Sequence, residues 1–106
     1  MHDDAELLRR YAQEGAEAAF AELVTRHIDF VYSAALRQVG GDAHRAKDVA
    51  QLVFTTLARK ADAVAMHPAL PGWLYNTTLH IAQRAMRSEY RRRIRETEAL
   101  RMSATE

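Results

Sequence analysis

The side chains best suited to bind a ligand lie between positions 76 and 91, and they are polar or cationic. They recur every three or four residues, as Asn76, His80, Arg84, Arg87 and Arg91. On a helix this spacing puts them on one face. Because a guanidinium group matches the geometry of phosphate oxygens, the pattern indicates a surface that binds a polyanion.

An apolar stripe runs along another face of the same segment. It consists of Leu74, Thr78, Ile81 and Ala85. One helix can therefore pack on a core while it presents the polar face to a ligand. We expect this helix to begin at Pro71 and to end at about Met102. Trp73, in its first turn, is predicted to cover the core rather than to bind a ligand.

Positive charge is concentrated in the same part of the chain. The net charge is only +1, but residues 1–62 carry eight Lys/Arg against ten Asp/Glu, whereas residues 63–106 carry seven Arg against four Glu. Glu89 with Arg93, and Arg92 with Glu96, have the four-residue spacing of intrahelical ion pairs, so part of this charge is expected to be neutralised. Arginines near a helix end also stabilise its dipole, so the asymmetry alone does not establish phosphate binding.

Glycine and proline divide the chain into four segments without an internal helix breaker. Glycine occurs only at positions 15, 40, 41 and 72, and proline only at 68 and 71. Within the segments apolar residues recur in steps of three and four, and no alternation is long enough for a strand. We therefore predict an all-α fold, a compact bundle of about four helices. Their expected ranges are 3–15, 17–39, 43–61 and 71–102.

Capping residues and an apolar stripe define the first three helices. Asp3 and Asp42 are placed as N-caps, and Gly15 and the Gly40-Gly41 pair are placed as helix stops. The helix over residues 17–39 is predicted to form the centre of the core. Its stripe comprises Phe20, Leu23, Val24, His27, Ile28, Val31, Ala35, Leu36 and Val39. We interpret the histidine in this stripe as a packed or boundary residue rather than a ligand.

The helix over residues 43–61 has an outer face that core packing does not explain. That face carries Lys47, Asp48, Gln51, Leu52, Thr55 and Arg59. A single exposed leucine is ordinary, but Leu52 beside Gln51 and Asp48 suggests a patch that binds a partner.

The segment over residues 62–72 is predicted to be the only sizeable loop. It keeps the apolar residues Val64, Met66 and Leu70. These side chains either contact a partner or pack under the bundle, and the sequence favours neither interpretation.

Composition bounds the class of protein. The chain has 106 residues, of which 48% are hydrophobic, enough for one domain with a core. It has no cysteine, which excludes disulfides and thiolate metal sites. No apolar run approaches the roughly 20 residues that span a bilayer, so a cytoplasmic protein that does not insert into membranes is expected.

Signatures of catalysis are missing from the sequence. The five histidines occupy positions 2, 27, 44, 67 and 80, with no pair at three- or four-residue spacing. Neither a glycine-rich phosphate loop nor a G-x-S-x-G motif occurs. We predict no catalytic residues, no metal site and no cofactor, and hence no enzyme activity.

Three segments together resemble region 2 of the extracytoplasmic-function (ECF) subfamily of bacterial RNA polymerase sigma factors, in the sigma-70 family. They read FAELVTRHIDFVYSAALRQVG, DAHRAKDVAQLVFTTLARK and LPGWLYNTTLHIAQRAMRSEYRRRIRETEA. The most specific parts are the D-V-x-Q-x-V-F block over 48–54 and the Gly-Trp-Leu sequence followed at a fixed distance by Arg87. The resemblance covers roughly residues 4–100.

The resemblance implies one surface for the polymerase and one for promoter DNA. It assigns Asp48, Gln51, Leu52 and Thr55 to the clamp helices of the polymerase β′ subunit. Leu52 stands where the family commonly has glutamate. Met66 and His67 would lie near a base flipped out of the −10 element. Along the non-template strand would lie Asn76, His80, Arg84 and Arg87, and Arg91 shares their face.

The resemblance also implies a domain organisation and a regulator. Residues 1–102 would be the region 2 domain and residues 103–106 the frayed start of an interdomain linker. The family's second DNA-binding domain, region 4, has no counterpart in these 106 residues, which suggests a domain cut from a longer chain. An anti-sigma factor or another regulator is an expected partner.

A helical protein-interaction module, with no direct contact to DNA, is the alternative interpretation. In that case the arginines of the last helix would serve only solubility. Salt-dependent binding to a nucleic acid distinguishes the two, because only phosphate contacts release counterions.

Overall fold

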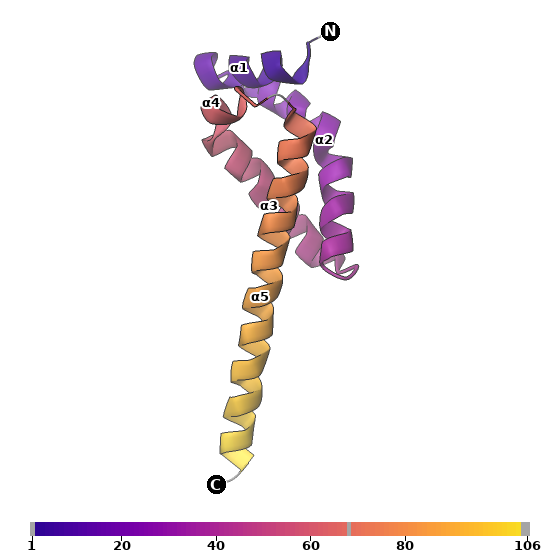
Figure 1. Ribbon diagram of the computed structural model, residues 1–106, viewed down its shortest axis with the longest axis vertical. Coiled ribbons are helices and arrows are strands. Elements are labelled where there is room, and N and C mark those ends of the chain that lie inside the picture. The colour runs from indigo at the N-terminus through magenta and orange to yellow at the C-terminus, as the bar shows by residue number, and fades with distance from the viewer. Residues whose placement is uncertain (1, 68, 105–106) are drawn as a thin grey trace.

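The computed structural model describes residues 2–67 and 69–104, which form five helices and no strand (Figure 1). The helices are α1 (Asp4–Glu14), α2 (Glu17–Gln38), α3 (Ala43–Arg59), α4 (Ala61–Val64) and α5 (Leu70–Ala104). The all-α prediction is confirmed, and the four long helices begin and end within two residues of the predicted positions. Within this part of the chain, none of the helices combines the length and apolar character needed to cross a membrane.

Local sequence sets the helix ends. The Asp3 carboxylate accepts a hydrogen bond from the backbone N–H of Glu6 at 2.8 Å, and Asp42 accepts one from the N–H of Arg45 at 3.1 Å. Gly15 closes α1 in the left-handed conformation, at φ +66°, which glycine adopts without steric cost. The predicted N-caps are therefore confirmed.

Helices α2, α3 and α5 pack around one core, and α1 lies across one end of it, against α2 and α4 (Figure 1). The largest fully buried apolar side chains come from α1, α2, α3 and α5: Leu7, Leu8, Leu23, Val31, Val49, Val53, Leu57 and Leu74. Full burial of one such side chain stabilises a fold by about 1.5–3 kcal/mol. Since α3 contacts both α2 and α5, it can form a surface groove on each of its two sides.

Polar contacts add to the apolar packing between α1 and α2. Nε2 of His27 lies 2.9 Å from Oδ2 of Asp4, and Nη1 of Arg26 lies 3.3 Å from Oδ1 of the same carboxylate. The side chain of His27 is 14% exposed. It occupies the boundary position that the apolar stripe predicted.

The segment predicted to be a loop contains one turn of helix, α4. The two interpretations of its apolar residues each hold for part of the set. Val64 and Leu70 are buried under the bundle, whereas the side chain of Met66 is 85% exposed. His67 folds back on the chain, because its Nδ1 accepts a hydrogen bond from the N–H of Ala69 at 3.2 Å.

Several residues of the predicted apolar stripes, among them Ile28 and Ile81, are only partly buried. The stripes of α2 and α5 are wider than the core, and their edges reach the surface grooves. Trp73 packs partly buried against the core, as predicted. Thr78 is fully buried, and its hydroxyl donates to the carbonyl of Leu74 at 2.7 Å, which satisfies the polar group.

Helix α5 continues well beyond the bundle (Figure 1). Its 35 residues span about 52 Å at 1.5 Å per residue, and the molecule measures 66 × 23 × 22 Å. Every residue from Tyr90 to Ala104 is exposed, and we call this stretch the free end of α5. It runs two residues past the predicted end at Met102. Of the predicted linker start, residues 105 and 106 lie outside the described residues.

Candidate functional site

A polar groove of about 370 Å³ lies between the end of α3 and the first turns of α5, and we call it the basic groove. Helix α5 supplies its residues from successive turns, because positions three and four apart share a face. The predicted residues Asn76, His80 and Arg84 all line it. The other lining residues are Thr56, Arg59, Lys60, Trp73, Thr77 and Ile81.

The described lining of the basic groove has three cations and no carboxylate. Among the described residues, Arg59, Lys60 and Arg84 form no ion pair, so their charge is available to a ligand. Trp73, which the sequence predicted only to cover the core, also lines this groove, together with the hydrogen-bonding side chains of Asn76 and His80. Cations with a flat ring and polar side chains are the combination that binds phosphates and bases of a single strand.

Arginines continue from the groove along the outer face of α5 and onto its free end. They are Arg84, Arg87, Arg91 and Arg95, and we call them the arginine stripe. All four are exposed, and none forms an ion pair within residues 2–67 and 69–104. The predicted residues Arg87 and Arg91 thus lie on the predicted face, but beyond the groove.

Ion pairs involve the arginines on the other side of α5. Arg92 and Arg93 approach the carboxylate of Glu89 at 2.8 and 3.4 Å. The predicted pair of Glu89 with Arg93 is confirmed. In the described residues Arg92 forms its ion pair with Glu89 instead of the predicted Glu96. The hydrogen bond from Arg92, with the charges of Arg92 and Arg45, holds the pKa of Glu89 below its ordinary value, although burial opposes this shift. The same bond raises the pKa of Arg92.

Met66 and His67 do not join the basic groove. Met66 lines a hollow against α1, beside Arg9 and Asp62, and His67 lines a second one with Leu8 and Pro71. Of the seven predicted DNA-binding residues, three therefore line the basic groove and two lie farther along the same face of α5. Met66 and His67 lie apart from both.

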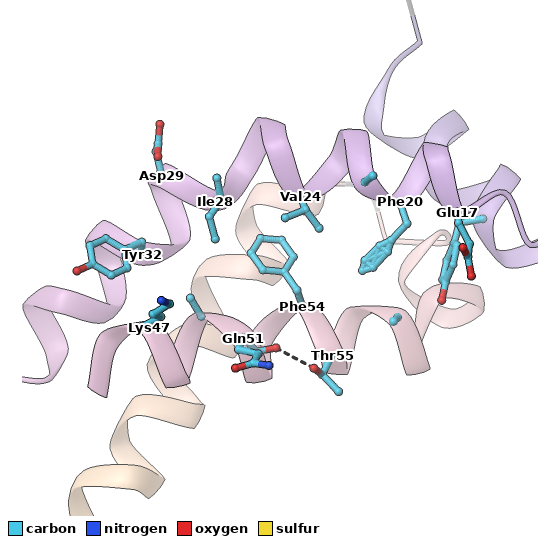
Figure 2. Close-up of a pocket in the computed structure, with 14 residues that line it drawn as sticks. Glu17, Phe20, Val24, Ile28, Asp29, Tyr32, Lys47, Gln51, Phe54 and Thr55 are labelled. Carbon is cyan, nitrogen blue, oxygen red and sulfur yellow. Dashed lines mark hydrogen bonds between the residues drawn. The ribbon is translucent and has the colours of Figure 1, made fainter. Parts of the chain in front are cut away.

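A larger groove of about 920 Å³ lies on the opposite side of α3, between α3 and α2, and we call it the apolar groove. Figure 2 shows Phe20, Val24 and Ile28 pointing from α2 toward Phe54 of α3. The ring of Tyr11 closes one end with an edge contact to Phe20, at 4.7 Å between ring centroids.

Polar residues form the rim of the apolar groove. They are Glu17, Asp29, Lys47, Gln51 and Thr55 (Figure 2). The hydroxyl of Thr55 donates to the backbone carbonyl of Gln51 at 2.8 Å. An apolar floor with a polar rim suits the apolar face of a partner helix.

The residues predicted to bind the polymerase occupy the outer face of α3 and the rim of the apolar groove. Gln51 and Thr55 line the groove, whereas Asp48 and Leu52 are exposed beside it. Leu52 is 52% exposed, one of the large apolar side chains on the surface. The four residues form one continuous surface of α3.

Several residues of these surfaces were not predicted as ligands. Arg59 and Lys60 reach the basic groove from the end of α3, and Arg95 extends the arginine stripe by one turn. A sequence signal existed for Arg95, because it follows Arg91 by four residues. No comparable signal existed for Lys60, which is brought to α5 by tertiary packing.

No cluster of histidine, aspartate and glutamate able to hold a metal ion occurs in the described part of the chain. The family model described as Sigma-70 region 2 matches residues 23–95. The matched stretch contains the residues of α2, α3 and α5 that line the two grooves, except those at the start of α2. No curated protein and no solved structure matches the chain.

Proposed function

The chain belongs to the Sigma-70 region 2 family, whose members bind RNA polymerase and recognise the promoter −10 element, and on that premise we propose which surface meets which partner. The basic groove and the arginine stripe bind the non-template strand of the −10 element. The outer face of α3, with the apolar groove, binds the clamp helices of the polymerase β′ subunit. The domain thereby helps to open the promoter.

The charge and shape of the basic groove support the assignment to DNA. Its cations Arg59, Lys60 and Arg84, which have no ion pair among the described residues, provide phosphate contacts. Trp73 provides a surface on which a base can stack, and stacking is worth about 1–3 kcal/mol per base. Arg87 and Arg91 extend the contacts along the strand, whereas Met66 and His67 would contact a flipped base only outside this groove.

The chemistry of the apolar groove supports the assignment to a helical protein. Its floor is built from aromatic and branched side chains, and its rim carries Gln51 and Thr55. Burial of such side chains by a partner is the main source of affinity in helix-in-groove recognition. Asp48 and Leu52 enlarge the surface on the outer face of α3.

Further features of the proposal follow from the sequence resemblance. We assign the chain to the ECF subfamily and expect it to act in the cytoplasm. An anti-sigma factor or another regulator is a second partner, in competition with the polymerase for the α3 surface. We propose no catalytic activity for the domain itself, since the polymerase performs the chemistry of transcription.

One observation carries the proposal: α3 separates two grooves of different chemistry, one cationic and one apolar. Two binding experiments test it. The chain should co-elute with a purified β′ clamp-helix fragment, and Gln51→Ala should weaken that complex. A single-stranded −10 oligonucleotide should bind with an affinity that falls by about 0.7 log units per contacted phosphate for each log unit of salt.

The second candidate function is a protein-interaction module without DNA contact, and the size of the apolar groove favours it. A flat salt response, together with unchanged oligonucleotide binding in Arg87→Ala and His80→Ala, would support this module instead. Failure of the β′ fragment to bind, while it binds another sigma factor, would reject the polymerase assignment.

A further inference from the structure

Glu89 stands where α5 leaves the bundle. Its side chain is 14% exposed, whereas every residue over Tyr90–Ala104 is exposed. One carboxylate oxygen lies 3.4 Å from Nη2 of Arg45 on α3. The other lies 2.8 Å from Nη2 of Arg92 and 3.4 Å from Nε of Arg93. A single carboxylate thus joins α3 to the first turn of the free end.

The helical structure of the free end depends on this junction more than that of the rest of α5, which packs on the bundle. All 15 residues of the free end are exposed, and isolated helices of about this length are only marginally stable in water. Helical structure must therefore propagate into it from the bundle. The ion pairs of Glu89 with Arg92 and Arg93 span the point at which α5 leaves the bundle, and pairs at this spacing stabilise a helix.

Removal of the carboxylate would leave like charges at this point. Arg45, Arg92 and Arg93 gather around Glu89, and the only other carboxylate paired with Arg45 in the described chain is Asp42, at 3.7 Å. Three guanidinium groups without Glu89 repel one another, which destabilises the first turn of the free end.

We propose that Glu89 is a positioning residue for DNA binding, which holds Arg91 and Arg95 in line with Arg84 and Arg87. This inference rests on the proposed binding of DNA by α5. The positioning role and the change in net charge predict opposite effects on DNA binding when Glu89 is replaced. Loss of a negative charge should strengthen binding to a polyanion by simple electrostatics, whereas loss of Glu89 should weaken it.

Two charge-matched variants, Glu89→Gln and Glu98→Gln, test the proposal. Glu98 is an exposed residue of the free end whose only described pair is with Arg101 at 3.7 Å. The probe is a single-stranded −10 oligonucleotide long enough to reach from the basic groove to the free end. At 0.1 M salt Glu89→Gln should bind at least about fivefold more weakly, the value of one phosphate contact, and Glu98→Gln should bind equally or more tightly.

A distance measurement tests the positioning role without DNA. The chain has no cysteine, so Ser33→Cys and Ser103→Cys, both at exposed positions, can carry a specific pair of spin labels. The parent chain should give one narrow distance distribution, which Glu89→Gln should broaden and Glu98→Gln should not.

Equal or tighter DNA binding in Glu89→Gln would overturn the proposal, as would an unchanged distance distribution. If the parent chain fails to bind the oligonucleotide, the proposed function fails instead. The distance distributions then still decide whether Glu89 fixes the direction of the free end.

Discussion

The two grooves beside α3 differ in size, polarity and charge, which determine the kind of ligand that a groove binds, although α3 forms a wall of both. The apolar groove is about 920 Å³ and lined by aromatic and aliphatic side chains, with Glu17, Asp29 and Lys47 among its rim residues. The basic groove is about 370 Å³, and in the described part of the chain its lining has three cations without an ion pair and no carboxylate. One side of α3 therefore suits a protein and the other a nucleic acid.

The difference shows how a small domain can serve two partners at once. Because α3 has a buried face, an outer face and two flanks, a ligand in one groove leaves the other accessible. The two grooves have no described lining residue in common, and both lie on the same core. Substitutions in the core should affect both activities, and substitutions in one groove should affect one.

The largest effect is expected from Leu57→Ala. Leu57 is fully buried on α3, in the core of the bundle. Its truncation should lower the free energy of unfolding by about 2–5 kcal/mol, measured by urea denaturation. Leu52→Ala, at an exposed position of the same helix, should change it by less than about 0.5 kcal/mol. Equal losses in the two variants would contradict the assignment of the α3 faces.

A reciprocal pair of variants, Ile28→Ala and Ile81→Ala, should separate the two grooves. Both residues are partly buried, and each lines one groove. Ile28→Ala should weaken binding of the β′ clamp-helix fragment by about tenfold, because about 1.4 kcal/mol of apolar contact is lost, and should leave oligonucleotide binding unchanged. If Ile81→Ala weakens the same complex equally, the two grooves do not have separate partners.

Arg59→Ala should reduce DNA binding by a smaller factor. Loss of one phosphate contact at 0.1 M salt weakens binding by about fivefold and lowers the salt slope by about 0.7. Arg37→Ala is the control, since Arg37 is an exposed arginine of α2 that lines neither groove. Titration of the oligonucleotide at several salt concentrations measures both quantities, and identical slopes for the two variants would remove α3 from the DNA surface.

The smallest expected effect is the pH dependence of the free end. The pKa of Glu89 lies below its ordinary value of 4.5, chiefly because of the hydrogen bond from Arg92. Its stabilising contribution is therefore complete above about pH 4.5 and is lost as the pH falls through the lowered pKa. Helicity followed by circular dichroism from pH 7 to pH 3 should show a larger loss in the parent chain than in Glu89→Gln, because only the parent chain carries the Glu89 carboxylate. Superimposable profiles would show that Glu89 contributes nothing there.

Most of the fold could be predicted because its signals are local. The glycines at 15, 40 and 41 and the caps at Asp3 and Asp42 are read from adjacent residues, and they set the helix ends. The apolar stripes correctly predicted which face of each helix points inward, but not how much of each stripe the core buries. Ile28 and Ile81 belong to the same stripes as the core, and only the packed structure shows that these edges line grooves.

The candidate site could be predicted in part, for a related reason. Asn76, His80 and Arg84 share one helix face, so their spacing predicts that they lie together. Arg59 comes from a different helix, and its place beside them depends on how α3 packs on α5. The family resemblance alone supplied Met66 and His67, and neither lines the basic groove.

The free end of α5 also changes how large the molecule looks in solution. A compact chain of 106 residues has a radius of gyration of about 13 Å, whereas this molecule has 17.8 Å. The same relation gives 17.8 Å for a compact chain of about 245 residues. A monomer of 12.0 kDa should therefore elute from a sizing column near the position of a globular dimer, and its mass has to be measured by light scattering.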